Sequence, residues 1–198
     1  MKEFNKKNLI IVISSPSGAG KTTVCNKIVE RDQKIGLSIS DTTRPARDNE
    51  INGVDYNFIN ELEFKLKIKN NAYLEHAYVF GNYYGSPSKN VEDHFINNRD
   101  IIFDIDWQGA SQLKKIEFSN IVSIFIVPPS RDIIYQRLKL RSEKSGDDLE
   151  AIDERMKQYD TEMHHKDEYD YIIINDEIEK CVKDIELIIN NHRNRLIN

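Results

Sequence analysis

The stretch SSPSGAGKTT, residues 14–23, decides the fold of this chain. Loops that wrap phosphates read Gly-x-x-x-x-Gly-Lys-Ser/Thr, and the sequence has this ending in Gly20, Lys21 and Thr22. Ser15 stands where the opening glycine belongs. The stretch follows an apolar run, LIIVIS, and opens a helical pattern, which is the context that the motif requires. This context predicts a working phosphate loop.

The predicted loop contains the groups that phosphate binding needs. Successive backbone N–H groups at a helix N-terminus form a nest for anions, expected here from Ala19, Lys21 and Thr22. Gly18 and Gly20 allow unusual backbone angles and a close approach of the ligand. The Lys21 ammonium is expected to bind the transferring phosphate, and the Thr22 hydroxyl to hold Mg²⁺.

Ser15 is compatible with this loop, because the first loop position lies where the strand leaves the sheet. Pro16 pushes Ser15 toward an extended conformation, so we expect no left-handed backbone there. The alternative, a Gly-rich turn with a surface lysine, fits the flanking elements less well. The residues predicted to bind ATP on the loop are Ser15, Pro16, Ser17, Gly18, Ala19, Gly20, Lys21, Thr22 and Thr23.

The composition argues against several classes of protein. The chain has 198 residues, 39% apolar and 31% charged, which suits one soluble domain with a core. A net charge of −5 argues against a broad nucleic-acid-binding surface, although not against a local arginine cluster. Cys25 and Cys181 lack CxxC spacing, so neither a disulfide framework nor a zinc site is expected. No segment is long enough to span a membrane, and we expect a cytoplasmic protein.

Short apolar runs alternate with helical patterns along the chain. Strands are predicted at Leu9–Ser14, Asp100–Trp107, Asn120–Pro129 and Tyr169–Asn175. Helices are predicted at Thr22–Arg31, Ser88–Asn98, Gln108–Ile116, Arg131–Arg141, Glu150–His165 and Glu177–Arg195. The alternation predicts an α/β fold of the P-loop NTPase type, a parallel sheet with helices on both faces.

Residues 38–87 break this rhythm. They are rich in Asn, Gly and Tyr and contain short alternating runs such as DYNFI and AYLEHAYVF. We interpret them as an inserted α+β sub-domain with its own small sheet. Residues 142–149, SEKSGDDL, are charged and contain a glycine, which predicts the exposed tip of a helical hairpin.

Two aspartates follow the apolar part of the run DIIFDIDW. Asp104 and Asp106 are two residues apart, so on a strand they share one face. Carboxylates at the carboxyl end of a central strand are well placed to position hydrated Mg²⁺ beside a phosphate loop. The alternative is a structural aspartate at a strand-end turn, which is common for one residue and less favoured for two on one face.

Arginines occur in two groups that suit phosphate chemistry. Arg44 and Arg47 lie on a proline-containing loop, where two guanidinium groups can bind a phosphate monoester. By pattern alone, a solvated loop is the more common explanation. Arg137 and Arg141 share one helix face, and Arg155 follows on the next helix. Such side chains can neutralise charge on a transferring phosphoryl group, or they can pair with acids on an exposed face.

Together these stretches resemble the guanylate kinase family, whose members phosphorylate GMP with ATP. The resemblance covers nearly the whole chain and keeps the family's order of SSPSGAGKTT, SISDTTRPARDNEINGVDYNFI, LEHAYVFGNYYGSP, DIDWQG, VPPS, RLKLR and YIIIND. The second and third runs are far more specific than the phosphate loop. The run RSEKSGDDLEAIDERM departs from the family, because it is longer than the usual lid and lacks a glycine after Arg141.

The resemblance implies a core of residues 1–37, 88–137 and 168–198, a GMP-binding insertion at 38–87 and a lid at 138–167. It implies that the GMP phosphate is held by Arg44, Arg47, Tyr56 and Tyr84. It implies that guanine is read by Ser40, Glu75, Ser86 and Asp104. A carboxylate at position 75 can accept both N1–H and N2–H of guanine, whereas adenine leaves it unpaired.

The resemblance also assigns the residues around the phosphoryl donor. Those implied for catalysis are Lys21, Arg44, Arg137, Arg141 and Arg155. Asn175 is expected beside the adenine of ATP, and Thr22 and Asp106 are expected to hold Mg²⁺ through water. The lid is expected to exclude water, so that GMP is the acceptor.

The expected function is transfer of the γ-phosphoryl group of ATP to GMP, and also to dGMP, giving GDP and ADP in purine nucleotide metabolism. No nucleic-acid or membrane partner is expected, and the sequence leaves open whether the protein is a monomer or a homo-oligomer. One alternative is a scaffold domain that binds phosphopeptides, disfavoured by Lys21, Thr22 and Asp106. The other is a kinase that acts on a different phosphorylated acceptor.

Overall fold

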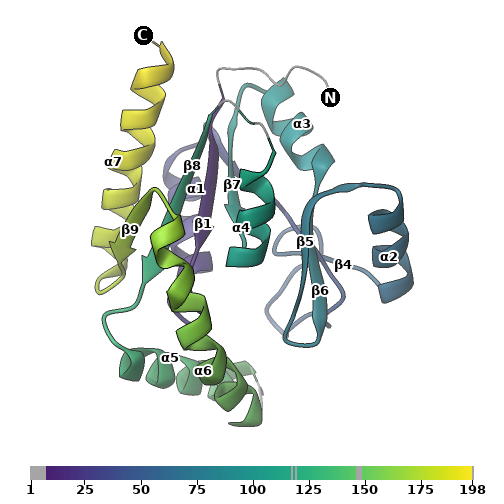
Figure 1. The fold of residues 1–198 in the computed structure, drawn as a ribbon, viewed down its shortest axis with the longest axis vertical. Coiled ribbons are helices and arrows are strands. Elements are labelled where there is room, and N and C mark those ends of the chain that lie inside the picture. The colour runs from purple at the N-terminus through teal and green to yellow at the C-terminus, as the bar shows by residue number, and fades with distance from the viewer. Residues whose placement is uncertain (1–7, 117, 119, 146–148, 198) are drawn as a thin grey trace.

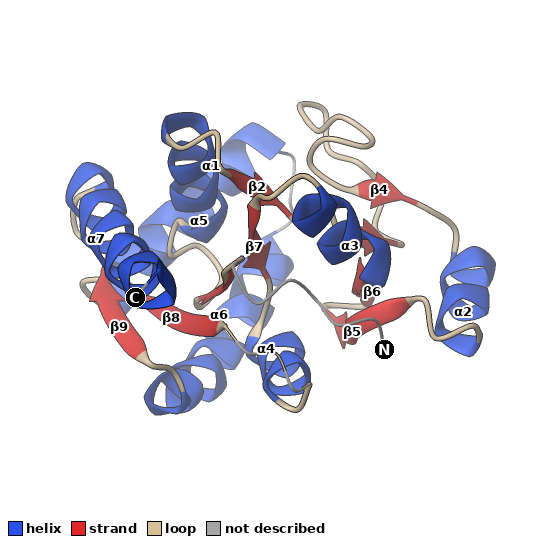
Figure 2. Ribbon diagram, turned by 90° about the horizontal axis from the view of Figure 1, so that it is seen from above, coloured by secondary structure: helices blue, strands red, loops and turns tan. Residues whose placement is uncertain are grey.

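The computed structural model describes residues 8–116, 118, 120–145 and 149–197 and contains a central sheet of five parallel strands (Figures 1 and 2). Their order across the sheet is β2-β7-β1-β8-β9. The strands are β1 (Ile10–Ser14), β2 (Ile35–Leu37), β7 (Asp100–Asp104), β8 (Ile121–Val127) and β9 (Tyr171–Ile174). All five residues of β1 are buried, as expected for a continuous apolar run in the middle of a covered parallel sheet.

Helices cover both faces of this sheet, as Figure 2 shows from above. Alternate residues of β1 point to opposite faces, so Ile11 packs with α1 (Lys21–Arg31) and α7 (Ile178–Ile197). On the other face, Val12 packs with α3 (Ser88–Ile96) and α4 (Trp107–Lys114). The carboxyl ends of the strands therefore share one edge, where open α/β sheets bind their ligands.

Residues between β2 and α3 form a second, four-stranded sheet, which lies beside the central one (Figure 1). Its order is β4-β3-β6-β5. Its elements are β3 (Asp41–Thr42), β4 (Asn57–Phe58), α2 (Glu61–Lys69), β5 (Tyr73–Val79) and β6 (Asn82–Pro87). The buried Phe64 of α2 stacks between the rings of Tyr73 and Tyr83, with ring centroids 4.7 and 5.2 Å away, and so fastens the helix to the small sheet.

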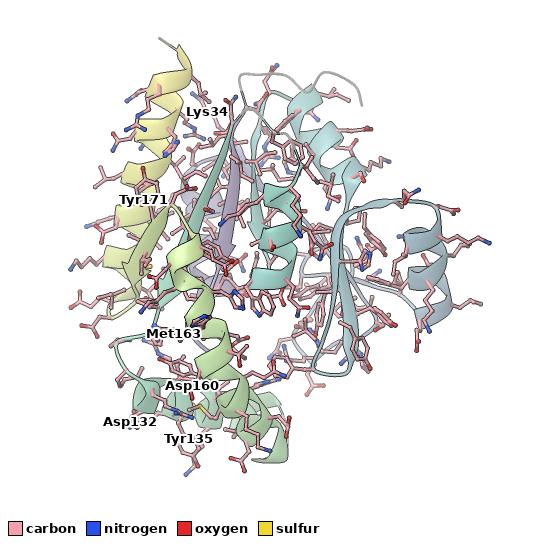
Figure 3. All side chains as sticks on the ribbon, viewed as in Figure 1. Lys34, Asp132, Tyr135, Asp160, Met163 and Tyr171 are labelled. Carbon is pink, nitrogen blue, oxygen red and sulfur yellow. The ribbon has the colours of Figure 1, made fainter. Side chains whose placement is uncertain are left out.

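Two helices, α5 (Arg131–Ser145) and α6 (Leu149–His164), form a hairpin below the carboxyl edge of the central sheet (Figure 1). Their buried side chains, Ile134 and Ile152 among them, pack on Ala19 of the phosphate loop. Figure 3 labels Asp160 on α6, whose carboxylate accepts a hydrogen bond of 3.1 Å from Arg131 on α5. A 3₁₀ turn at His165–Glu168 then leads to β9. None of the described helices combines the length and the apolarity needed to cross a bilayer.

The predicted fold class is confirmed, with boundaries moved by a few residues. The strand expected to run to Trp107 ends at Asp104, because the chain turns there into α4. The expectation that Asp104 and Asp106 share a strand face is therefore wrong. The strand β2 and the helix α2 were not located from the sequence. Residues 146–148 of the predicted hairpin tip lie outside the described residues.

A buried carboxylate holds the small sheet together. Asp41 on β3 is fully buried and accepts hydrogen bonds from Asn57 (2.9 Å), Lys67 (2.8 Å) and the Tyr73 hydroxyl (2.7 Å). These donors come from β4, α2 and β5, so one side chain links four elements. We expect it to matter because each donor loses its partner when the carboxylate is removed.

We predict that Asp41→Ala lowers the free energy of unfolding by about 2–4 kcal/mol, because it removes three hydrogen bonds to a buried carboxylate, one of them from the Lys67 ammonium. Urea denaturation followed by circular dichroism measures this. The matched control is Asp48→Ala, since Asp48 is an exposed aspartate of the same sub-domain; its effect should stay within about 0.5 kcal/mol. Equal effects of the two variants would contradict the structural role given to Asp41.

Candidate active site

The phosphate loop connects β1 to α1 through a turn that only glycine can make. Gly20 has φ of 92°, and a Cβ placed there would lie 2.6 Å from the side-chain nitrogen of Asn175. A larger residue would therefore be strained and would also collide. The first N–H groups of α1 have no helical partners, as at the start of any α-helix, and are available to an anion.

Ser15 and Ala19 shape the opening arm of this loop. Ser15 is nearly buried, does not have a positive φ, and donates its hydroxyl to the Pro16 carbonyl at 3.0 Å. The expected absence of a left-handed backbone at Ser15 is confirmed. The Ala19 N–H, expected in the phosphate nest, instead donates to the Pro16 carbonyl at 3.1 Å. Ala19 is thus a buried turn residue that closes the loop.

Asn175 supports the loop from the end of β9. Its side chain is fully buried and donates to the Ala19 carbonyl at 2.7 Å. Arg137 donates to the same carbonyl at 3.4 Å and to the Asn175 carbonyl at 3.2 Å. The side-chain oxygen of Asn175 has no hydrogen-bond partner in the described structure, and the expected contact with adenine stays a prediction.

Asp104, at the end of β7, faces the helix end of the loop. It forms an ion pair with Lys21, and it accepts the Thr22 hydroxyl at 2.7 Å. Burial opposes the charge on Lys21, but the Asp104 carboxylate outweighs it, and the pKa of Lys21 is raised above its ordinary value. Lys21 is therefore a fixed cation at neutral pH.

Asp106 has a different place from Asp104. It caps the N-terminus of α4, where its carboxylate accepts the Gly109 N–H at 3.0 Å and the Gln108 side chain at 3.1 Å. Its charge is one cause of the raised pKa of Glu75. Gly109 also faces Glu75, because a Cβ at Gly109 would lie 2.3 Å from that carboxylate. Asp106 thus lies beside Glu75 and accepts these hydrogen bonds from α4, whereas Asp104 accepts hydrogen bonds from side chains of the phosphate loop.

Glu75 is a buried carboxylate at the junction of the two sheets. It accepts the Ser86 hydroxyl at 2.6 Å, and the Ser86 and Ser40 hydroxyl oxygens lie 3.3 Å apart. Burial is the largest cause that raises the pKa of Glu75, to about 7, against the Ser86 hydrogen bond that lowers it. A buried acid with open acceptor capacity can read ligand N–H groups.

Arg44 and Arg47 are joined by an acid that the sequence had not singled out. Glu50 accepts Arg44 at 2.7 Å, the Arg47 side chain at 3.3 Å and the Arg47 backbone N–H at 2.8 Å. Burial opposes ionisation of Glu50, but Arg44 outweighs it, so the pKa of Glu50 is lowered. The Arg44 guanidinium also lies 5.5 Å from the Tyr56 ring centroid. These contacts aim two fixed cations into one cavity.

The loop, the small sheet and the helical hairpin all contribute to the lining of this open cavity of about 820 Å³. On the hairpin, Arg155 lies over the Phe80 ring at 5.7 Å, so α6 reaches the turn between β5 and β6. The Arg141 side chain lies outside the described residues. Of the predicted site residues, those lining the cavity are Ser15, Pro16, Ser17, Gly18, Gly20, Lys21, Thr22, Thr23, Ser40, Arg44, Arg47, Tyr56, Glu75, Tyr84, Asp104, Asp106, Arg137 and Arg155.

Among the lining residues that the sequence did not indicate are two acids with defined hydrogen-bond partners, Glu50 and Glu162. Glu50 lies within the run quoted above, three residues after Arg47, and this spacing was the available signal. Glu162 lies on α6 and had no signal, because its partner is 145 residues away along the chain. Among the described residues, no group of three or more His, Cys, Asp or Glu is placed to hold a metal by itself.

Comparison with known proteins gives consistent matches. A family model described as guanylate kinase matches residues 7–192. The guanylate kinase of Rickettsia bellii is 45% identical over 189 residues, covering 96% of this chain and 97% of that protein. That of Zymomonas mobilis is 43% identical, covering 93% and 84%. A crystal structure of guanylate kinase from Anaplasma phagocytophilum matches with a TM-score of 0.76 and 36% identity, covering 96% and 88%.

We predict that Ser15→Gly changes activity little and lowers stability by about 0.5–1 kcal/mol, because glycine adds unfolded-chain entropy where no positive φ is needed. Steady-state kinetics and urea denaturation measure the two effects. A large rise in ATP affinity in this variant would mean that the serine compromises the loop.

Proposed function

The chain belongs to the guanylate kinase family, and we propose how its cavity transfers the γ-phosphoryl group of ATP to GMP. The observation that carries the proposal is one cavity with two separate cation sites. Lys21 lies on the phosphate loop, and Arg44 with Arg47 lies on the inserted sub-domain. One site suits the donor phosphates and the other suits the acceptor phosphate. In-line transfer needs both to face one space.

The acceptor phosphate is assigned to Arg44 and Arg47, with the hydroxyls of Tyr56 and Tyr84. Glu50 supports this assignment, because it fixes both guanidinium groups before a ligand arrives. The conformational-entropy cost of ordering these two long side chains is therefore incurred when the protein folds and not when the ligand binds. Arg44 and Arg47 can then make the paired hydrogen bonds that a phosphate monoester accepts.

The base of GMP is assigned to Glu75, Ser86, Ser40 and Asp106. The resemblance had implied Asp104 as a guanine contact. We replace it with Asp106, because Asp104 is held by Lys21 and Thr22. Guanine donates N1–H and N2–H to carboxylates, which favours the ionised form of Glu75. Adenine has no such donors and would leave a buried acid unpaired, which is the source of discrimination. These groups are assigned to the base and not to the sugar, so dGMP is proposed as a second acceptor.

The donor phosphates are assigned to the helix end of the loop, at Gly18 and Gly20 to Thr23, and to Lys21. Mg²⁺ is proposed as the cofactor, and the Thr22 hydroxyl with the adjacent Asp104 carboxylate fits it, because both are oxygen donors at the loop. A bound Mg²⁺ supplies charge neutralisation on the phosphate oxygens. Asp104 here replaces Asp106, which the resemblance had implied as a Mg²⁺ ligand. We still propose that these residues hold Mg²⁺ through water.

Neutralisation of the negative charge on the transferring phosphoryl group is assigned to Lys21, Arg44, Arg137 and Arg155. Arg141 is kept in this role from the sequence prediction. Arg137 and Arg155 line the cavity from the two hairpin helices. We propose that residues 138–167 act as a lid, 38–87 as the GMP-binding insertion and the rest as the core. A lid that carries these arginines removes water as it delivers positive charge.

We predict ADP release with GMP and dGMP as acceptors, and little with AMP, CMP or UMP, in a coupled assay of the purified protein. Lys21→Ala should lower kcat at least about 10²–10³-fold while the variant still melts cooperatively, because the lysine charge matters most in the transition state. Near-normal activity of this variant with a normal melt would contradict the phosphate-loop role. A scaffold domain would release no ADP with any acceptor.

We predict opposite specificity changes for Glu75→Gln and Arg44→Ala. Glu75→Gln places a donor against a guanine N–H and should cost about 2–4 kcal/mol in kcat/KM for GMP, narrowing the gap to AMP. Arg44→Ala should weaken GMP and AMP alike, because both carry the same 5′-phosphate. Steady-state kinetics with both acceptors measures this.

A pH series provides the control for the Glu75 variant. Because the pKa of Glu75 is about 7 in the free protein, acid converts its acceptor oxygens into a protonated carboxyl, and KM for GMP should rise below that pH. Glu75→Gln should lack this rise. Equal losses for GMP and AMP, with the pH dependence unchanged, would make Glu75 a structural strand residue.

A further inference from the structure

Glu162 is a carboxylate in the cavity that the mechanism above does not use. It lies in the last turn of α6, is 8% exposed, and lines the same cavity as Lys21. A buried acid in a site built for polyphosphate is unfavourable unless something in the protein holds it. A carboxylate in this position therefore needs a hydrogen-bond partner within the protein.

The partner is a backbone N–H of the phosphate loop. Ser17 donates its N–H to the Glu162 carboxylate at 3.2 Å, which joins α6 to the opening arm of the loop. Pro16 has no N–H, so the amide of Ser17 is the first one after Ser15 that an anion could reach. The carboxylate thus occupies a backbone donor on the cavity wall that a phosphate oxygen could otherwise use.

The turn that carries Glu162 is fixed from two further directions. Met163, labelled in Figure 3, packs on the apolar cluster beneath α4. His165 stacks flat on Trp107, with ring centroids 3.7 Å apart, and lies 2.6 Å from Glu168. Because two residues that follow Glu162 are anchored, Glu162 is held against Ser17 by packing and not only by its own hydrogen bond.

The charges that face Glu162 come from several elements. Burial is the largest cause that raises its pKa, to about 7; the Ser17 N–H and Lys21 lower it, and Asp106 raises it. Arg137 and Arg155 line the same cavity from the hairpin helices. Glu162 is therefore ionised above neutral pH in the free protein, and added phosphate charge opposes that ionisation.

We propose that Glu162 is a positioning residue for the phosphoryl donor: its carboxylate occupies the Ser17 N–H, and so confines the ATP phosphates to the helix end of the loop. The inference rests on the proposed function, since it assumes that ATP binds this loop. Its physical basis is that a phosphate seated at Ser17 would draw the γ-phosphoryl group away from the arginines of the acceptor site. A displacement of about 1 Å is enough to slow transfer strongly.

The test compares three variants in the phosphotransfer assay. Glu162→Gln keeps an acceptor oxygen for Ser17, so its kcat should stay within about threefold of wild type, whereas Glu162→Ala frees the amide and should lower kcat about 10- to 100-fold. KM for GMP should not change in either. KM for ATP should fall about two- to fivefold in both, since a negative charge is removed. The control is Glu154→Ala, an exposed glutamate on the same helix, which should behave as wild type.

A pH series separates positioning from a structural role. Above about pH 8 the wild-type carboxylate is charged, so the ratio of the wild-type KM for ATP to that of Glu162→Gln should be largest. Below about pH 6 this ratio should approach one, because both side chains are then neutral. ATP ionises identically in both assays, so the ratio isolates Glu162.

Distinct outcomes separate the inference from the function it rests on. A wild-type protein that does not phosphorylate GMP overturns the proposed function. Wild-type activity with equal kcat for Glu162→Gln and Glu162→Ala, or with a KM ratio for ATP that is flat in pH, overturns the role of Glu162 alone. If Glu162→Ala does not fold, the pH series on Glu162→Gln still decides, since that variant keeps the contact with Ser17.

Discussion

The rest of the structure depends on the backbone turn that carries the chain from β1 into α1. Gly20 makes this turn with a positive φ, against the buried side chain of Asn175. The turn aims the start of α1 and Lys21 into the cavity. The neighbouring strands then complete the site, because β7 ends at Asp104, which holds Lys21, and β9 ends beside Asn175, which holds Ala19. Because all strands of a parallel sheet run in the same direction, their carboxyl ends lie at one edge.

Carboxylates organise a cavity whose ligands are anions. Asp104 and Glu50 are paired with cations that the ligand phosphates also need, so these cations are oriented in advance, whereas Glu75 and Glu162 accept neutral donors; in every pair the desolvation of the acid is offset by its hydrogen bonds. A ligand phosphate then competes with an internal carboxylate and does not have to order a mobile side chain. The pairs are Asp104 with Lys21 and Thr22, Glu50 with Arg44 and Arg47, Glu75 with Ser86, and Glu162 with Ser17.

The helix α2 shows why local pattern was insufficient in the inserted sub-domain. Its sequence, ELEFKLKIK, alternates apolar and charged residues, which is a strand period. It is nevertheless helical, because Asn60 caps its N-terminus by accepting the Glu63 N–H at 2.9 Å and because Phe64 is buried between two tyrosines. Leu62 is left 81% exposed as a result. Tertiary packing thus overrides a two-residue period in a short segment.

The sequence by itself determined the parallel α/β core, the phosphate loop and the family, because buried apolar runs and a Gly-rich motif are local signals. Through the resemblance to guanylate kinases it also predicted roles for several arginines and for Glu75, and of these the ones that line the cavity are Arg44, Arg47, Arg137, Arg155 and Glu75. Only the tertiary structure decided which aspartate faces the loop, since β7 ends between Asp104 and Asp106. It alone placed Asn175 under the loop and Glu162 against Ser17. Such contacts join residues more than a hundred positions apart, and no sequence period encodes which side chains meet across that separation.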